Sequence, residues 1–230
     1  MRIDILTTFP EMFPPVLEAS ILARAQAKGV VRIGVHDLRD WSKDKHRKVD
    51  DKPYGGGAGM VLSAEPILRA VDSLAKEKRV KDKKQKIVIL SAKGKQFNQK
   101  TAYSWAKKYR RIIFVSGRYE GIDERVKIAL RAEEISIGPF VLTDGDAAAM
   151  VIISAIARLI PGVIKLESLA EESHGNLLLK KEAKAAAGKG LEYPHYTRPE
   201  VLQYRGKKYR VPKILLSGDH KKIKAWREKH

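Results

Sequence analysis

The sequence predicts an α/β fold, in which helices cover a parallel β-sheet. Three short apolar runs carry this prediction, at residues 87–90, 112–115 and 135–137. Each has the length and composition of a buried strand, and each leads into a segment that contains glycine. Helical stretches lie between these runs, and strands that alternate with helices indicate a parallel sheet.

The first sixty residues predict two strands, one helix and a long loop. Residues 1–8 alternate in polarity as a strand does, and residues 30–36 form a second candidate strand. Between them, a helix is expected to open at Pro10 and to run to about Ala27, with Gly29 ending it. Residues 37–60 are charged first and glycine-rich afterwards, which predicts a loop.

The middle of the chain predicts the rest of the sheet and its helices. Helices are expected over residues 66–78 and 123–131, and the charge run at 76–86 is interpreted as a solvated turn. The third buried strand is expected to continue into Phe140–Val141–Leu142. Residues 147–159 form an apolar helix that is too hydrophobic to face water and stops at Pro161–Gly162.

The composition changes after this helix, which predicts a domain boundary. Residues 167–189 are polar and helix-prone, and the chain from Leu191 onward has few apolar residues, several prolines and many basic ones. We expect a first domain at 1–162, a linker or lid at 163–190, and a smaller domain at 191–230.

Composition favours a soluble, cytoplasmic protein. Of the 230 residues, 43% are hydrophobic, which is enough for a core, and no run approaches the roughly 18–20 apolar residues of a membrane span. Asp4 stands where a signal peptide is apolar. The absence of cysteine excludes disulfides, thiolate metal sites and a cysteine nucleophile.

The net charge of +19 favours a polyanionic partner, because each phosphate neutralised by a basic side chain releases counterions. Solubility alone, or an organism with basic proteins, is the alternative explanation. An anionic membrane surface fits less well, since no basic amphipathic helix with large apolar anchors is visible.

Three glycine-bearing segments predict a ligand pocket. They span residues 90–94, 117–121 and 136–145, and each lies at or beside the end of an apolar run. Ligands of open α/β sheets bind beyond the carboxyl ends of the strands, so the three segments can line one pocket. Ordinary turn glycines remain the alternative.

A fourth glycine segment, residues 54–60, follows the basic run at 43–48. It fits neither a Walker loop nor a dinucleotide fingerprint, so phosphate contact and a flexible hinge both stay open. His46, His174 and His195 lack the spacing of a zinc site, and no dedicated metal site is expected.

Seven sequence motifs, taken together, support a more specific inference than any one of them alone. The chain closely resembles the bacterial tRNA (guanine-N1)-methyltransferase family, known as TrmD. The resemblance covers nearly the whole chain and rests on these blocks, which occur in one order: TFPEMF (8–13), DDKPYGGGAGM (50–60), GRYEGIDER (117–125), SIG (136–138), IPGV (160–163), PHYTRPEV (194–201) and LLSGDH (215–220).

The resemblance implies a trefoil-knotted parallel sheet of the SPOUT class, although knots are rare in proteins. It implies that the three glycine segments bind S-adenosylmethionine, that the enzyme is a homodimer with shared active sites, and that a smaller, mostly helical C-terminal domain holds tRNA. The substrate it implies is guanosine 37, immediately 3′ of the anticodon. Magnesium is a further ion that it brings into consideration.

The resemblance also gives roles to individual positions. The cofactor-binding positions are Leu90, Ser91, Ala92, Gly117, Tyr119, Glu120, Gly121, Ser136, Ile137, Gly138, Phe140, Leu142 and Gly145. The tRNA-binding positions are Arg47, Tyr54, Gly57, Arg118, Asp123, Arg198, Lys221 and Lys222.

The catalytic positions are Arg158 and an acid in the interdomain segment. The family carries an aspartate there, whereas this chain reads ESLAEESH at 167–174 and has none. With a one-residue gap Glu172 takes the place, and Glu171 is the near competitor. Other departures are Asp144 and Ala148, where the family often has glycine and proline. An insertion at 177–190 and a short C-terminal part bear on tRNA affinity more than on chemistry.

The chemistry needs a base and a cation. Guanine N1 carries a proton, so a carboxylate that removes it makes attack on a methyl group feasible, while a guanidinium stabilises the charge that develops on O6. The missing aspartate supports one rival, a non-catalytic RNA-binding protein that has kept the fold. A second rival is a knotted methyltransferase of ribosomal RNA, against which the blocks at 54–57 and 196–199 argue.

Overall fold

A computed structural model describes residues 1–76, 84–165 and 193–229. The chain divides into two compact units, Met1–Leu166 and Glu167–His230, which are considered separately. Most of the expected linker at 163–190, including the insertion at 177–190, lies outside the described residues.

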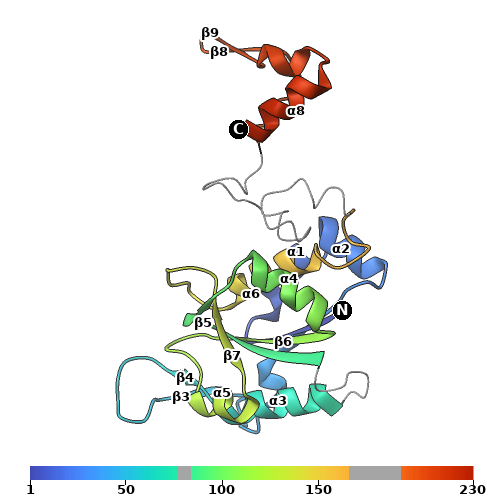
Figure 1. Cartoon of the computed structure of the whole chain (residues 1–230). Helices are drawn as coiled ribbons and strands as arrows, with labels where there is room; N and C mark the ends of the chain where they lie inside the picture. Colours follow the sequence, from blue (N-terminus) through green and yellow to red (C-terminus); the bar gives the residue numbers. More distant parts are fainter. Residues whose placement is uncertain (77–83, 166–192, 230) are drawn as a thin grey trace. The chain divides into compact units, whose positions relative to one another are not determined.

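The first unit is built on a five-stranded, wholly parallel sheet with the order β2-β1-β6-β5-β7 (Figure 1). The α/β fold with a parallel central sheet is therefore confirmed. Its strands are β1 (Arg2–Thr7), β2 (Arg32–Asp37), β5 (Gln85–Gln96), β6 (Arg111–Ser116) and β7 (Glu133–Ser136).

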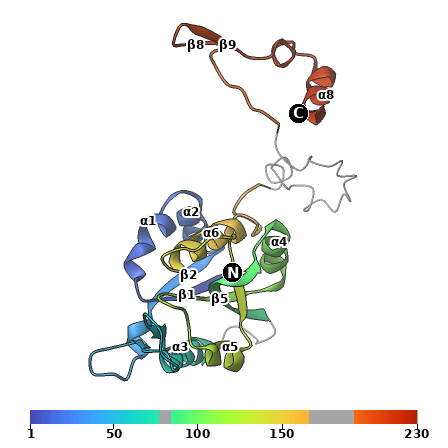
Figure 2. The ribbon, with the colours of Figure 1, turned by 90° about the vertical axis from the view of Figure 1, so that its left-hand side faces the viewer.

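Helices cover both faces of the sheet, as Figures 1 and 2 show. One face carries α1 (Pro14–Leu17), α2 (Ser20–Ala27), α4 (Gln99–Lys108) and α6 (Asp146–Ala157), and the other carries α3 (Ala64–Lys76) and α5 (Glu124–Leu130). Each face has its own apolar core, one around Phe114 and Ile152 and the other around Ile113 and Ile67. The apolar helix predicted at 147–159 thus buries most of its side chains within this unit.

Three expectations for the first hundred residues are corrected. The single helix at 10–27 is three pieces, η1 (Pro10–Met12), α1 and α2, and α1 is separated from α2 by the extended backbone of Ala19 and the left-handed φ of 51° at Ser20. The loop at 37–60 contains η2 (Leu38–Trp41) and β3 (Asp50–Asp51), which pairs with β4 (Val61–Leu62).

The third correction concerns the charge run at 76–86, whose last two residues begin β5. Lys86 is largely buried there, with an ion pair to Glu133 and its ammonium group 5.1 Å from the centre of the Trp105 ring. The aliphatic part of a lysine side chain can pack on an apolar surface while an acid neutralises its charge. A run of charged residues in the sequence therefore does not exclude a strand.

The second unit contains a β-hairpin that the sequence analysis did not predict. β8 (Val201–Tyr204) and β9 (Lys207–Arg210) pair antiparallel and are followed by η5 (Lys213–Leu216) and α8 (His220–Lys229). Arg205 and Gly206 both have positive φ, as two-residue hairpin turns require. The described residues of this unit are accordingly not mostly helical.

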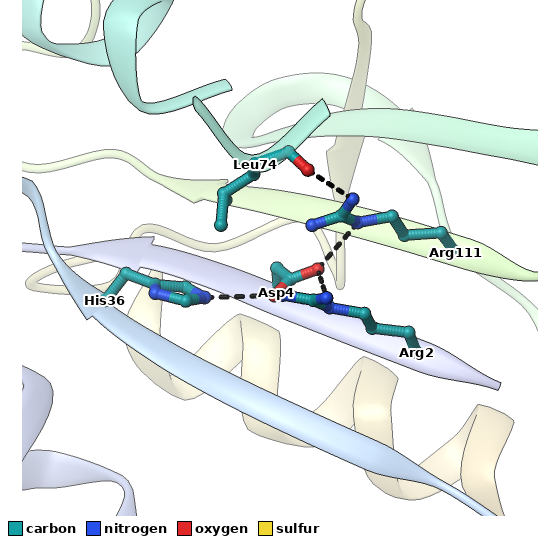
Figure 3. Close-up of polar contacts among 5 residues, drawn as sticks. All are labelled: Arg2, Asp4, His36, Leu74 and Arg111. Atoms are coloured by element: carbon teal, nitrogen blue, oxygen red, sulfur yellow. Dashed lines mark hydrogen bonds and ion pairs between the residues drawn. The ribbon is translucent and has the colours of Figure 1, made fainter. Parts of the chain in front are cut away.

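A buried polar cluster joins strands β1, β2 and β6 of the sheet to α3 (Figure 3). Asp4 on β1 is fully buried and accepts hydrogen bonds from Arg111 Nε at 2.8 Å and from Arg2 Nε at 3.0 Å, and its Oδ1 lies 2.9 Å from His36 Nε2. Arg111 also donates from Nη1 to the Leu74 carbonyl at 2.6 Å. The cluster therefore ties three strands and one helix together by charge-assisted bonds.

Candidate functional site

The carboxyl ends of β5, β6 and β7 enclose a cavity of about 390 Å³ in the first unit. This volume lies within the range of small-molecule sites. All the predicted cofactor-binding residues line it except Gly138. The structure therefore brings together three segments that are separate in the sequence, at residues 90–94, 117–121 and 136–145.

One wall of the cavity is a bulge in β5, where the sequence analysis expected a loop. Leu90 pairs with Ile135 of β7, and Lys95 pairs with the same residue, so that residues 91–94 bulge out of the ladder. A Cβ on Gly94 would lie 2.5 Å from the Ile135 amide nitrogen, which explains why glycine is needed there. The bulge places Ser91 and Ala92 against the cavity.

Gly138, one of the predicted cofactor-binding residues, shapes the turn that follows β7. It does not line the cavity, and a Cβ there would lie 2.2 Å from an edge atom of the Phe140 ring. Ser136 Oγ donates to the Gly138 carbonyl at 2.8 Å and fixes this turn. Gly138 thus leaves room for Phe140, which is 52% exposed and lines the cavity itself. Phe140–Leu142 form an exposed loop and not a strand.

Three segments that line the cavity approach one another closely at Gly145. The Gly145 amide donates to the Gly117 carbonyl at 2.8 Å. A Cβ on Gly145 would lie 2.9 Å from the Gly117 nitrogen and 3.1 Å from the Leu90 side chain. The end of β5, the end of β6 and the start of α6 are therefore in direct contact.

Gly145→Ala is expected to weaken S-adenosylmethionine binding by about 5- to 100-fold, since overpacking of a tight contact typically costs about 1–3 kcal/mol. Gly145 has an ordinary φ of −81°, so its backbone conformation suits alanine, and what opposes the substitution is the close approach of the added Cβ to Gly117, Ser116 and Leu90. Calorimetry on the chain without RNA measures the affinity. Ala129→Ser, at an exposed position of α5 that does not line the cavity, is the control, and an unchanged affinity for Gly145→Ala would contradict this account.

A ring of four charges, which the sequence analysis missed, borders the cavity. Lys93 of the β5 bulge lies 3.3 Å from carboxylate oxygens of both Glu124 and Glu134, and Lys127 lies 3.2 Å and 2.6 Å from the same two residues. These hydrogen bonds raise the pKa of Lys93 and of Lys127 and lower that of Glu124. The ring joins the bulge to α5 and β7.

Asp146 is a buried acid at the first turn of α6, next to the cavity residue Gly145. Burial raises the pKa of its carboxyl, and hydrogen bonds with Ser116 and Thr7 oppose that shift. The Asp146 amide donates to Asp144 Oδ1 at 3.0 Å. Asp146 thereby links the ends of β1 and β6 to the start of α6.

The glycine loop at 54–60 is joined to the cavity by backbone hydrogen bonds. The Glu120 amide donates to the Met60 carbonyl at 3.0 Å, and the Leu62 amide donates to the Gly121 carbonyl at 3.0 Å. Tyr54 in this loop is fully exposed, and Gly57 has a φ of +122°. A ligand that moves this loop therefore acts directly on a wall of the cavity.

The residues predicted to bind tRNA divide between the two units. Arg118 and Asp123 line the cavity, and the Arg118 guanidinium stacks on Phe9, 3.9 Å from the ring centre. Arg47 forms an ion pair with Asp40. Arg198, Lys221 and Lys222 belong to the second unit.

The two predicted catalytic residues lie away from this cavity or outside the described residues. Glu172 and its competitor Glu171 are outside them. Arg158 follows the last residue of α6 and does not line the cavity, which contacts the opposite end of that helix. Twelve residues of helix separate the two ends by roughly 18 Å.

The fold and the cavity define an α/β protein with a cavity of small-molecule size at the carboxyl edge of a parallel sheet. The chain belongs to a family described as tRNA (guanine-1)-methyltransferase TrmD, whose model matches residues 1–230. The resemblance inferred from the seven blocks is confirmed.

Several relatives support the assignment, each named tRNA (guanine-N(1)-)-methyltransferase. The relative from Thermomicrobium roseum is 49% identical over 227 residues, which cover 99% of this chain and 77% of the relative. The one from Carboxydothermus hydrogenoformans is 49% identical over 229 residues (100% and 82%), and the one from Chloroflexus aggregans is 50% identical over 227 residues (99% and 81%). Among the described residues, no helix is both long and apolar enough to cross a membrane.

Proposed function

We propose that this chain transfers a methyl group from S-adenosylmethionine to N1 of guanosine 37 in tRNA. The main support for this activity is that the chain belongs to the family. The cavity formed by the three glycine segments supports the binding of S-adenosylmethionine. The excess of 46 lysines and arginines over 27 acids fits an RNA substrate.

The cavity suits S-adenosylmethionine in size and in lining. Its edges at Gly117 and Gly145 are backbone, and a Cβ at either would meet neighbouring atoms at 2.9–3.0 Å. Apolar side chains such as Ile137 and Leu142 line the cavity together with these glycines and suit an adenine ring. When bound, S-adenosylmethionine supplies an electrophilic methyl group on a positively charged sulfur.

The chain's own residues then have to move one proton and stabilise one charge. In this proposal the Glu172 carboxylate takes the proton from guanine N1, and the N1 electron pair forms the new bond to the methyl carbon while the bond between that carbon and sulfur breaks and leaves its electron pair on the sulfur. The Arg158 guanidinium stabilises the negative charge that develops on O6. The target base leaves its stack to reach the cavity.

A trefoil knot and a homodimer are further parts of the proposal. The direct contact of Gly145 with Gly117 and Leu90 supports a chain that threads between the ends of β5 and β6. Because Arg158 lies at the far end of α6, a second copy is the simplest way to bring an arginine and an acid to the cavity. Ala147, Val151 and Ser154 form an exposed face of α6 that suits such a contact.

Light scattering at micromolar concentration is expected to give twice the chain mass of 25.8 kDa. Val151→Glu is expected to give monomers, because the charge would have to be buried in the interface. Ile128→Glu is the matched control, since Ile128 is 70% exposed on α5, away from that face. A monomeric unmutated chain would contradict the dimer and the shared site together.

The described residues lend magnesium no support as a part of the proposal. No group of three or more histidine, aspartate or glutamate side chains that could hold a metal ion occurs among residues 1–76, 84–165 and 193–229. No step of the proposed reaction uses a metal.

Methyl transfer to unmodified tRNA, followed by mapping of the modified base, tests the proposed function. We expect 1-methylguanosine at position 37, and none in a transcript with adenosine there. A methyl group on another RNA would favour a ribosomal RNA methyltransferase. Tight tRNA binding with no transfer would favour the non-catalytic RNA-binding protein.

A further inference from the structure

We propose that the C-terminal unit binds RNA by stacking an unpaired nucleobase in an aromatic cavity, and not by phosphate contacts alone. The proposal deepens the proposed function, on which it rests. The cavity has a volume of about 510 Å³ and lies within that unit. Its lining includes four aromatic side chains and two arginines: Tyr193, His195, Tyr196, Trp226, Arg198 and Arg227.

Two segments of the chain supply the rings. Tyr193, His195 and Tyr196 come from the PHYTRPEV block and the residue before it, and Trp226 comes from α8. The Val211 amide donates to the Glu200 carbonyl at 2.9 Å and joins the end of that block to the chain beyond β9. Tyr196 and Trp226, which are thirty positions apart, meet at this cavity.

The Tyr196 and Trp226 rings are not stacked on each other. The Tyr196 and Trp226 ring centres are 6.4 Å apart with planes at 59°, and the Tyr193 and His195 planes meet at 44°. Tyr196 is 50% exposed. Aromatic surface that borders a cavity and is only half covered is suited to a flat apolar ligand, and a nucleobase is one.

The positive charge of this unit indicates that the flat ligand belongs to a polyanion. Residues 193–229 contain eleven lysines and arginines and three acids, so the unit attracts a polyanion. The Arg227 guanidinium lies 4.7 Å from the centre of the Tyr193 ring, which places a cation beside the aromatic surface. Aromatic platforms within a basic surface are typical of proteins that bind single-stranded RNA. An unpaired base in a tRNA loop fits both properties.

Tyr196→Leu and Trp226→Leu test the proposal, because each removes a ring and keeps apolar bulk. We expect each to weaken binding of a short single-stranded oligoribonucleotide and of unmodified tRNA by about 5- to 100-fold, which is the effect of losing one stacked base. Binding of inorganic polyphosphate, which has the charges of RNA and no bases, should not change. Tyr209→Leu is the matched control, since Tyr209 is 53% exposed on β9 and does not line the cavity.

Two further variants keep the result interpretable. Trp226→Phe retains a flat ring and should keep most of the RNA affinity, whereas equal losses for the phenylalanine and leucine variants would overturn the proposal. Lys221→Gln combined with Lys222→Gln should weaken binding of RNA and polyphosphate alike and flatten the salt dependence of both.

Unchanged RNA binding by Tyr196→Leu and Trp226→Leu would show that the unit uses phosphate contacts alone, or that protein fills the cavity, and either result would overturn the inference. Because these measurements need no cofactor, they are separate from methyl transfer. A chain that stacks bases and transfers no methyl group would contradict the proposed function and leave the stacking site standing.

Discussion

Asp4→Asn is expected to lower the free energy of unfolding by about 3–5 kcal/mol, because it leaves a buried charge without a counter-charge. Arg111 is 1% exposed, and its Nε lies 2.8 Å from Asp4 Oδ2 (Figure 3). The Arg111 Nη2 atom has no hydrogen-bond partner among the described residues. The Asp4 carboxylate therefore supplies most of the interaction that offsets the burial of the Arg111 charge. Denaturation in urea, followed by circular dichroism, measures the change.

Two other variants show whether the buried charge is the cause. Asp4→Asn combined with Arg111→Met should recover much of the loss, since apolar residues of similar volume often replace a buried ion pair without cost. Arg2→Gln should cost less than about 1 kcal/mol, because the Arg2 side chain is 33% exposed. Equal losses for Asp4→Asn and Arg2→Gln would contradict the assignment.

The same cluster should make stability depend on pH at the acid end. Burial by itself would raise the pKa of Asp4, but hydrogen bonds with His36 and Arg2 and the charge of Arg111 hold it below its usual range. The native state therefore binds the proton less tightly than the unfolded chain. Stability from this group is present above the usual carboxyl pKa and is lost as pH falls through the native one. Asp4→Asn should lack this loss.

The core of the fold could be predicted from the sequence because its signals are local. The apolar runs at 87–90 and 112–115 are buried on both sides, as central strands of a parallel sheet are, and they form parts of β5 and β6. The helix from Ala64 to Lys76 has a clear apolar stripe and was predicted within two residues at each end.

Other elements depend on contacts between distant residues, and the sequence pattern did not predict them. β5 continues past its bulge to Gln96 because Lys95 and Gln96 find partners on β7, whereas the letters at 91–94 are typical of a turn. Lys86 enters the strand because Glu133 and Trp105 receive it. The helix break at Ser20 includes a left-handed φ, and a serine in the sequence does not predict that backbone conformation.

The candidate site, like the fold, could be predicted from the sequence only in part. The rule that ligands bind at the carboxyl edge of a parallel sheet, together with the family's motifs, placed Gly117 and Gly145 at one cavity. The four-charge ring was missed because Lys93, Lys127 and Glu134 come from three different elements and each letter alone suggests a solvated charge. The roles of all these residues in binding remain predictions.

Glu172→Gln is expected to reduce the single-turnover rate of methyl transfer by about 10²- to 10⁴-fold, which is the usual effect of removing a general base. Cofactor and tRNA binding should remain, because glutamine keeps the size of the side chain and the proposed cofactor cavity is lined by residues 89–148. The assignment rests on chemical need and on sequence: N1 must lose its proton, and Glu172 directly precedes Ser173 in the segment where the family has an aspartate and then a serine.

Two neighbouring variants decide between this acid and the alternatives. Glu171→Gln is the matched control and should be nearly silent, because a one-residue shift is the whole difference between the two candidates. Glu172→Asp restores the residue type of the family and is expected to retain activity or raise it, whereas a solvated lid residue would show no preference among these side chains. If Glu172→Gln transfers methyl groups as fast as the unmutated chain in a single turnover, Glu172 is not the base. The rate of Glu171→Gln then shows whether its neighbour takes the proton instead.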